Sequence, residues 1–332
     1  MKITVLMGGT SSERNVSLAS GIRIVQALRS KGHEVIALDP ARGVIDAAGE
    51  KTLASGKVGT APPSLESLSK VAEGAFLPNL TTMKEITGAD VVFLGLHGGQ
   101  GEDGTIQALL DMAGVKYTGS GHLASALAMD KDLSKKLFRA TDVKTADWLM
   151  APVTIEQVEG ILGLPVVVKP SKEGSTVGLS LVKKRGEIQP AITEALRFDN
   201  EVMIERFVPG RELTVGVLGD IALPVGEIIP KHEIYDYECK YTAGMAVEEF
   251  PAKISKEATE RVQQQALAAF KALKLKGCAR IDFRLTSEGE FYCLEANTLP
   301  GMTELSLIPQ GAAAMGISFP DFCERVAKLA LE

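Results

Sequence analysis

The sequence predicts an α/β fold that begins with a βαβ unit and continues into α+β lobes. The strand-like residues 3–7 end in Gly8-Gly9, and a helical pattern and a second strand-like run follow. This alternation of strand and helix indicates a parallel sheet. Further along, several strand-like runs flank one long helix, as in an α+β arrangement. With 332 residues, the chain is long enough for two or three such units.

The first third of the chain supplies the βαβ unit. Its expected elements are a strand at 3–7, a helix at 16–30, a strand at 34–39, a strand at 90–96 and a helix at 105–112. Residues 90–96 form a continuous apolar run, which is typical of a strand covered on both faces. Residues 41–75 are rich in Gly, Ala, Ser and Pro, and we expect an irregular insertion there. Glu13 and His97 lie just past strand ends, where such sheets collect ligands.

The remaining two thirds of the chain predict the lobes. A helical stretch at 122–140 precedes a strand at 165–169, a Gly/Ser loop, a strand at 179–183 and a helix at 187–197. Strands at 202–207, 212–218 and 222–229 follow, with a helix at 256–274 that Ser255 could cap. A hairpin and a terminal helix from about residue 320 complete the chain.

Composition excludes several classes of protein. The net charge of −6 disfavours a general nucleic-acid binder. No apolar run approaches the ~20 residues that cross a bilayer, and the N-terminus carries no signal-peptide pattern, so we expect a cytoplasmic protein. Four cysteines occur without a CxxC pair, and we expect reduced thiols.

The predicted hairpin near the C-terminus carries the most informative side chains. Residues 279–284 and 291–297 are strand-like runs joined by the turn Ser287-Glu288-Gly289. Alternation places Asp282 on one face of the first run, and Glu295 and Asn297 together on one face of the second. Oxygen ligands of this kind suit Mg²⁺ held jointly with nucleotide phosphates. For a hairpin taken alone, a solvated polar face is the alternative.

Five motifs in order identify a family resemblance. The string EANTLPGMTELS, with ARIDF upstream, resembles the C-terminal site of the ATP-grasp ligases, and most closely that of the D-alanine–D-alanine ligase family. Further matches are GGTSSERNVSLASG at 8–21, HGGQGEDG at 97–104, KPSKEGSTVG at 169–178 and YDYECKY at 235–241. They spread over nearly the whole chain.

The resemblance implies a three-unit ATP-grasp architecture with a Rossmann-like N-terminal domain. The expected boundaries are 1–118 for this substrate domain, 119–205 for the central lobe and 206–332 for the C-terminal lobe. The implied reaction joins two D-alanines through a D-alanyl phosphate, for bacterial peptidoglycan synthesis. It implies ATP as co-substrate, two Mg²⁺ or Mn²⁺ ions, a monovalent cation as a further candidate, and a homodimer. Neither nucleic acid nor membrane is an expected partner.

The resemblance also implies roles for residues that would otherwise have ordinary explanations. The Gly/Ser loop could be a simple β-turn and Lys131 a solvated helix charge, but their motifs resemble the cover of the ATP phosphates. Residues 203–213 resemble the adenosine clamp, although a charged strand end is the alternative for either of its glutamates. The implied ATP-binding residues are Lys131, Lys169, Glu205, Arg206, Phe207, Val208, Glu212 and Lys240.

The remaining roles concern the amino-acid substrates. Residues 235–241 could be a rigid surface loop or a lid that excludes water, and the resemblance favours the lid, with Tyr241 closing over the substrate and linking to Ser175 and Glu13. A lone glutamate such as Glu13 more often complements a helix dipole. The implied catalytic residues are Glu13, Ser175, Tyr241, Arg280 and Gly301, the substrate-binding residues His97, Ser306 and Leu307, and the metal ligands Asp282, Glu295 and Asn297.

Two other functions remain possible at the level of sequence. A related ligase that accepts D-lactate or D-serine would share every phosphate and metal residue, and Tyr241 favours D-alanine. A catalytically silent nucleotide-binding module would be expected to lack some of the residues of the hairpin, and none is missing.

Overall fold

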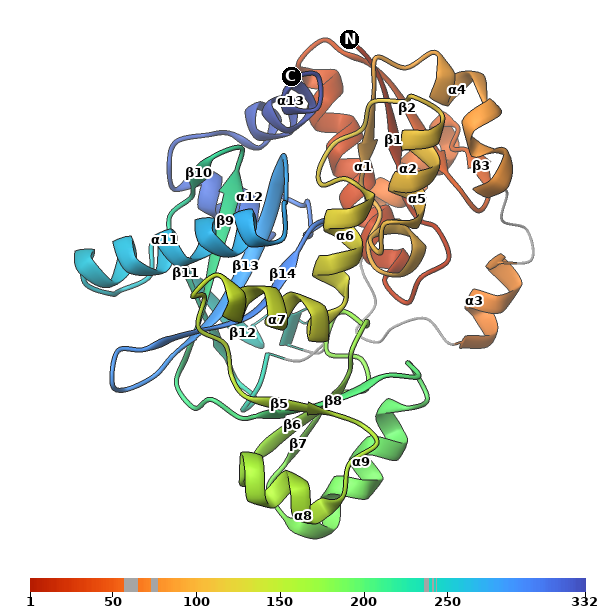
Figure 1. The fold of residues 1–332 in the computed structure, drawn as a ribbon. Coiled ribbons are helices and arrows are strands. Elements are labelled where there is room, and N and C mark those ends of the chain that lie inside the picture. Colours follow the sequence, from red (N-terminus) through yellow and green to blue (C-terminus); the bar gives the residue numbers. More distant parts are fainter. Residues whose placement is uncertain (57–64, 73–76, 236–238, 241, 243) are drawn as a thin grey trace.

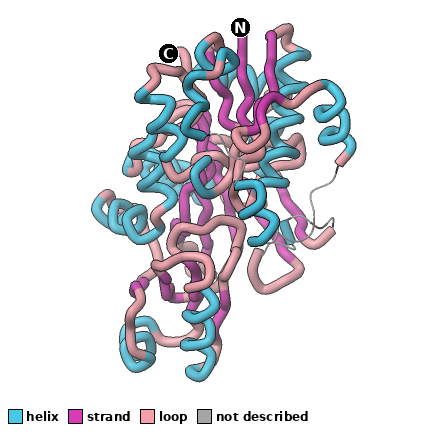
Figure 2. Tube along the Cα trace, turned by 90° about the vertical axis from the view of Figure 1, so that its right-hand side faces the viewer, coloured by secondary structure: helices cyan, strands magenta, loops and turns pink. Residues whose placement is uncertain are grey.

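Three sheets organise the molecule, one for each successive part of the chain. The computed structural model describes residues 1–56, 65–72, 77–235, 239–240, 242 and 244–332. In Figure 1, the N-terminal sheet lies at the upper right, the C-terminal sheet in the middle and the sheet of β5–β8 at the bottom. Figure 2, turned by 90°, shows the same lower lobe projecting from the rest of the molecule.

The N-terminal sheet confirms the predicted βαβ unit. Its strand order is β3-β2-β1-β4, and β1 runs parallel to both β2 and β4. The elements are β1 (Lys2–Leu6), α1 (Arg14–Ser30), β2 (Glu34–Asp39), β3 (Gly43–Val44), β4 (Val91–Leu94) and α5 (Thr105–Met112). Because β1 and β4 are neighbours, the loops after them meet, and these loops carry Glu13 and His97.

The expectation of an irregular insertion at 41–75 is wrong for its described residues. They contain β3 and two helices, α2 (Ala47–Ser55) and α3 (Leu65–Ala72). Asp46 caps α2 by accepting a hydrogen bond from the backbone N–H of Gly49 at 2.8 Å. The apolar residues of this segment are too weakly periodic to predict a helix, and the cap marks its start. The turn η1 (Leu77–Thr82) and helix α4 (Lys84–Thr87) lead back to β4.

The single helix expected at 122–140 is two helices, α6 (His122–Met129) and α7 (Lys131–Ala140). Asp130 separates them because its backbone is extended (φ −80°, ψ 99°) and its side chain caps α7 through the N–H of Leu133. The break lets the two helices point in different directions, which Figure 1 shows.

The central lobe is an antiparallel sheet in the order β5-β8-β6-β7, covered by helices. Its strands β6, β7 and β8 and helix α9 lie where the pattern predicts them, whereas β5 is too short to be predicted. The elements are β5 (Trp148–Met150), α8 (Ile155–Gln157), η3 (Val158–Leu162), β6 (Val166–Pro170), β7 (Ser180–Val182), η4 (Arg185–Glu187), α9 (Ile188–Ala195) and β8 (Val202–Arg206).

The C-terminal sheet has the order β12-β11-β9-β13-β14, with β10 beside β9. The strand expected at 222–229 is instead two short ones, β10 and β11, because residues 223–225 leave the ladder. Ser255 caps α11 by accepting from the N–H of Ala258 at 3.1 Å, as predicted. The elements are β9 (Arg211–Leu218), β10 (Ile221–Ala222), β11 (Gly226–Pro230), β12 (Ala246–Glu249), α11 (Lys256–Ala272), β13 (Cys278–Leu285), β14 (Phe291–Asn297), α12 (Leu307–Ala313) and α13 (Phe319–Leu329).

Apolar packing joins the two ends of the chain. Helix α13 lies against α1, and one hydrophobic cluster includes Ile24 and Leu28 from α1 together with Phe322 and Val326 from α13. All four cysteines are buried free thiols, as predicted. Among the described residues, no helix combines the length and apolar character needed to cross a membrane.

Candidate active site

Two adjoining cavities, of about 240 and 140 Å³, lie where the three sheets meet. The larger is lined by the loops after β1 and β4, by β14 and by the segment after it. The smaller is lined by β6, β8 and the hairpin. The residues lining both cavities include Lys131, Ser175, Lys240, Arg280 and Glu295.

The smaller cavity collects every residue predicted to bind ATP. Its lining includes Lys131, Lys169, Glu205, Arg206, Phe207, Val208, Glu212 and Lys240. The larger cavity collects the predicted catalytic and substrate residues that the structure describes: Glu13, His97, Ser175, Arg280, Gly301, Ser306 and Leu307. Residues separated by up to about 290 positions in the chain therefore form two groups that share one wall.

Arg284 of β13 lines the smaller cavity and holds several of its other lining residues in place. Its guanidinium donates to the backbone carbonyl of Val208 and to the carboxylate of Glu212, each at 3.1 Å, and lies over the ring of Phe207. Burial raises the pKa of Glu212 from its usual value, and the charge of Arg284 opposes the shift. Arg206 is more exposed and bonds to the carbonyl of Ile161.

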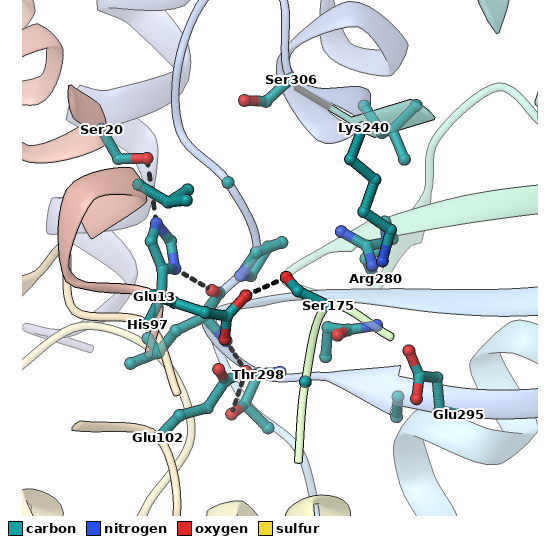
Figure 3. A pocket seen from close by; sticks show the side chains of 18 of the residues that line it. Glu13, Ser20, His97, Glu102, Ser175, Lys240, Arg280, Glu295, Thr298 and Ser306 are labelled. Carbon is teal, nitrogen blue, oxygen red and sulfur yellow. Dashed lines mark hydrogen bonds between the residues drawn. The ribbon is translucent and has the colours of Figure 1, made fainter. Parts of the chain in front are cut away.

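Glu13 is the centre of the larger cavity (Figure 3). Its carboxylate accepts a hydrogen bond from the hydroxyl of Ser175, which brings the Gly/Ser loop onto the N-terminal unit. Two glycines lie next to this carboxylate, one in the motif at 97–104 and one in the motif at 169–178. A Cβ atom on Gly98 or Gly174 would lie 2.7 or 2.8 Å from Oε2 of Glu13, so a side chain at either position would displace this carboxylate. Ser175 itself adopts a positive φ of 50°, which a non-glycine residue rarely does.

A buried chain of hydrogen bonds ties His97 to the segment after β14. Nδ1 of His97 lies 2.6 Å from the carbonyl oxygen of Leu299, so Nδ1 carries the proton and donates. Burial lowers the pKa of His97, which favours the neutral ring with Nε2 as an acceptor. The hydroxyl of Ser20 then donates to Nε2 at 2.9 Å and accepts from the N–H of Met302 at 3.1 Å.

Glu102 makes a second connection to the same segment, and sequence reasoning missed it. Its carboxylate accepts from the N–H groups of Thr298 and Leu299 at 3.1 and 3.0 Å, and from the N–H of Gly98 at 3.0 Å. Burial and the negative charge of Glu13 raise the pKa of Glu102 to about 7. The first of the two acidic residues within the motif HGGQGEDG was the available signal.

The predicted hairpin is present as β13 and β14. Asp282 pairs with Glu295 across β13 and β14, and Arg280 pairs with Asn297. Asp282 accepts from Thr214 at 2.7 Å, from Asn297 at 3.1 Å and from two nitrogens of Arg280 at 2.9–3.1 Å. The carboxylates and the carboxamide thus share one small surface.

Positive charge surrounds Glu295. Its Oε2 lies 3.4 Å from Nζ of Lys131, which also donates to the carbonyl of Glu173 at 2.8 Å. Burial by itself would raise the pKa of Glu295, but Lys131, Lys169, Lys240 and Arg280 lower it to about 2. Glu295 is therefore ionised at any physiological pH, as a metal ligand must be.

The segment after β14 leads into α12. Ser306 is the N-cap residue of α12, and Leu307 begins the helix. The hydroxyl of Ser306 accepts from the N–H of Thr303 at 3.0 Å and lies next to Gly301, where a Cβ atom would be 3.0 Å away. Figure 3 shows Ser306 on the side of the cavity near Lys240. Tyr241, the remaining predicted catalytic residue, lies outside the described residues.

Comparison with known proteins gives a consistent result along the whole chain. Family models described as the N-terminus and the C-terminus of D-ala D-ala ligase match residues 2–120 and 132–328. The D-alanine–D-alanine ligase of Geotalea uraniireducens is 42% identical over 329 residues, covering 98% of this chain and 94% of that protein. That of Aquifex aeolicus is 41% identical over 324 residues, covering 96% and 97%.

A solved structure agrees with the sequence relatives. The crystal structure of the D-alanine–D-alanine ligase of Bacillus anthracis complexed with ATP superimposes with a TM-score of 0.79 and 29% sequence identity. The match covers 100% of this chain and 97% of that one. The chain therefore belongs to the D-alanine–D-alanine ligase family.

Proposed function

We propose that this chain uses ATP to join two D-alanine molecules into D-alanyl-D-alanine through a D-alanyl phosphate. The observation that carries the proposal is the pair of adjoining cavities. One holds every predicted nucleotide residue, the other every described substrate residue, and Lys131, Lys240, Arg280 and Glu295 line both. A phosphoryl group transferred from ATP in the smaller cavity to D-alanine in the larger one must move past these shared residues.

The three sheets support a division into units at 1–118, 119–205 and 206–332, each with its own share of the site. The N-terminal unit supplies Glu13 and His97 for the amino acid, and the central lobe supplies Lys169 and Ser175. The C-terminal lobe supplies the oxygen ligands.

The reaction needs two bond exchanges. A carboxylate oxygen of the first D-alanine attacks the terminal phosphorus of ATP, and ADP leaves. The amine of the second D-alanine then attacks the carbonyl carbon of the acyl phosphate, and inorganic phosphate leaves with the bonding electrons. Positioning and charge neutralisation supply most of the catalysis in phosphoryl transfers of this kind.

The residues of the two cavities fit these steps. Glu13 faces the ammonium group of the first D-alanine, with Ser175 holding the carboxylate in place. Lys131, Lys169 and Lys240 balance the phosphate charges, and Tyr241 completes the lid. Arg280 and the N–H of Gly301 stabilise the oxyanion of the tetrahedral intermediate. The hydroxyl of Ser306 and the N–H of Leu307 bind the carboxylate of the second D-alanine.

The hairpin fits two Mg²⁺ or Mn²⁺ ions. Asp282, Glu295 and Asn297 offer carboxylate and carboxamide oxygens as ligands. Such oxygens suit a hard cation that is shared with phosphate oxygens. When bound, the ions would neutralise negative charge on the phosphates and hold them in line. Asp282 already accepts hydrogen bonds from Thr214, Asn297 and Arg280, so it is oriented toward this surface before any ion arrives.

Adenosine lies between Phe207, Val208 and Glu212, where Arg284 holds the strand end in place. Glu212 then accepts from the ribose hydroxyls, and Glu205 lies near the adenine amino group. The dipeptide product enters bacterial peptidoglycan, which implies a cytoplasmic enzyme, and the family implies a homodimer.

ADP formation with four acceptors tests the proposal. Turnover with D-alanine but not with L-alanine, D-serine or D-lactate is the expected result, and equal turnover with D-lactate would favour the related ligase. Asp282→Asn and Glu295→Gln should suppress turnover and shift the Mg²⁺ dependence to higher concentration. Asp321→Asn is the matched control, since Asp321 is 46% exposed and pairs with Lys31 on the surface. Normal rates for Asp282→Asn at low Mg²⁺ would contradict the metal assignment.

A further inference from the structure

Lys135 is a fully buried lysine that lines neither cavity. It lies on α7 one turn after Lys131, and its side chain is 0% exposed. Its Nζ donates to the carboxylate of Glu205 and to the hydroxyl of Thr145, and lies 5.1 Å from the centre of the Trp148 ring. Burying an ammonium group costs free energy unless the group is paired, so the partners of Lys135 indicate its role.

Glu205 is shared between two lysines. Oε1 accepts from Lys135, and Oε2 accepts from Nζ of Lys169 at 2.6 Å. Burial by itself would raise the pKa of Glu205, but the charges of Lys135 and Lys169 lower it to about 2. Of these lysines only Lys169 lines the smaller cavity; Lys135 approaches Glu205 from the protein interior.

Charge balance distinguishes the two lysines. With Lys135 present, two positive charges face one negative charge, and a surplus of one positive charge remains. Burial lowers the pKa of Lys135 and the charge of Glu205 opposes this shift, and the surplus is the same whether the proton that the pair shares resides on Lys135 or on Glu205. Without Lys135, Lys169 and Glu205 would form a neutral pair, and the lysine would offer little attraction to an anion.

We propose that Lys135 is a positioning residue for nucleotide binding, which neutralises Glu205 from the buried side and leaves the charge of Lys169 for the nucleotide phosphates. The proposal rests on the proposed function only in that the smaller cavity binds ATP. Lys135 itself touches neither nucleotide nor amino acid.

The same contact couples two lobes. The hydroxyl of Thr145, which accepts from Lys135, donates to the backbone carbonyl of Cys293 on β14 at 2.8 Å. The N–H of Cys293 in turn donates to the carbonyl of Lys144, also at 2.8 Å. Glu295 follows Cys293 by two residues on β14, just beyond a bulge in the hairpin that turns Glu295 toward the cavity while Cys293 stays in the core. Lys135 therefore connects the lysine that faces the phosphates with the strand that carries the oxygen ligands.

The test compares the binding of ATP with that of adenosine by titration calorimetry, without D-alanine and at a fixed Mg²⁺ concentration. The ratio of the two affinities isolates the phosphate contribution. Lys135→Met should reduce this ratio by about tenfold or more, because a charge-assisted contact to phosphate is lost. Lys136→Met is the control, since Lys136 is the next residue, is 60% exposed and pairs with Asp132 on the surface. It should leave the ratio unchanged.

A double variant separates charge balance from mere support of the fold. Lys135→Met combined with Glu205→Gln removes one charge of each sign, so the charge of Lys169 is again unbalanced and the ratio should return toward that of the wild type. A buried pair replaced as a whole is also better tolerated than a half-removed one. Glu205→Gln alone should give a ratio at or above that of the wild type, and this variant serves if Lys135→Met cannot be purified.

Three results would overturn the proposal: an unchanged ratio in Lys135→Met, no recovery in the double variant, or a ratio below wild type in Glu205→Gln. A purely structural role would weaken ATP and adenosine equally and would not be relieved by removing Glu205. ADP formation by the wild type with D-alanine, measured in parallel, tests the proposed function separately.

Discussion

Replacing Ser20 by alanine should show how much the buried hydrogen-bond chain around His97 contributes. Ser20 is fully buried on α1, and its hydroxyl is the only atom removed. It accepts from the N–H of Met302 and donates to Nε2 of His97. The substitution therefore leaves one buried donor and one buried acceptor without this partner.

The expected magnitude follows from these two groups. A buried polar group that loses its partner costs about 1–3 kcal/mol, so two such groups sum to about 2–6 kcal/mol. A water molecule in the vacated space would recover part of this, and we expect a loss of at least about 2 kcal/mol in the free energy of unfolding. Urea denaturation of the wild type and the variant measures it.

Catalysis should change as well, because Met302 follows Gly301. Without the hydrogen bond from the Met302 N–H to Ser20, the Gly301 N–H can move away from the position of the oxyanion. A displacement of this kind lowers kcat by about tenfold or more. The KM for ATP should stay within about twofold, since no nucleotide residue is touched.

The matched control is Ser30→Ala, at the exposed end of the same helix, where the hydroxyl donates only to the carbonyl of Ala27. It should change stability by less than about 0.5 kcal/mol. If Ser20→Ala costs no more than this control, the hydrogen-bond chain does not stabilise the segment, and the reasoning fails.

Two buried groups should give opposite pH dependences. The pKa of His97 is lowered from 6.5, so the folded state loses stability as pH falls below 6.5; His97→Gln should remove that loss. The pKa of Glu102 is raised from 4.5 to about 7, so its contribution to the free energy of unfolding is fully present below pH 4.5 and is lost as pH rises toward 7. Relative to the wild type, Glu102→Gln should therefore become less stable on acidification, and urea titrations from pH 5 to 7.5 compare the slopes; equal slopes in all three proteins would contradict both assignments. Gly210→Ala should destabilise by about 3 kcal/mol or more, since φ is +137° and the new Cβ would lie 2.1 Å from the carbonyl oxygen of Leu285. Gly289→Ala has only the strain of φ +80°, with nothing within 4 Å, and should cost about 1 kcal/mol in the same denaturation assay; similar values for the two variants would contradict the steric argument.

Local patterns in the sequence determined the parts of the fold whose causes are local. Alternation along 279–284 and 291–297 is a property of any strand, so the placing of Glu295 and Asn297 on one face could be predicted before the sheet was known, whereas the exact pairing of Asp282 with Glu295 depends on a bulge in the hairpin. The Ser255 cap and the βαβ unit have the same origin. The helix at 47–55 was missed because a single cap at Asp46, rather than a periodic apolar face, starts it.

Only the tertiary structure decided which distant side chains meet. Glu102 and Thr298 are 196 residues apart, and Lys135 and Glu205 are 70 apart, so no period along the chain relates them. Their meeting depends on how three sheets from different parts of the chain pack, and Lys135 read in isolation is an ordinary helix lysine. The sequence by itself thus determined what each element carries, and packing of the units decided which charges are buried against one another. The physical reason is that strand alternation and helix caps act within a few residues, whereas the burial of a charge depends on everything that surrounds it.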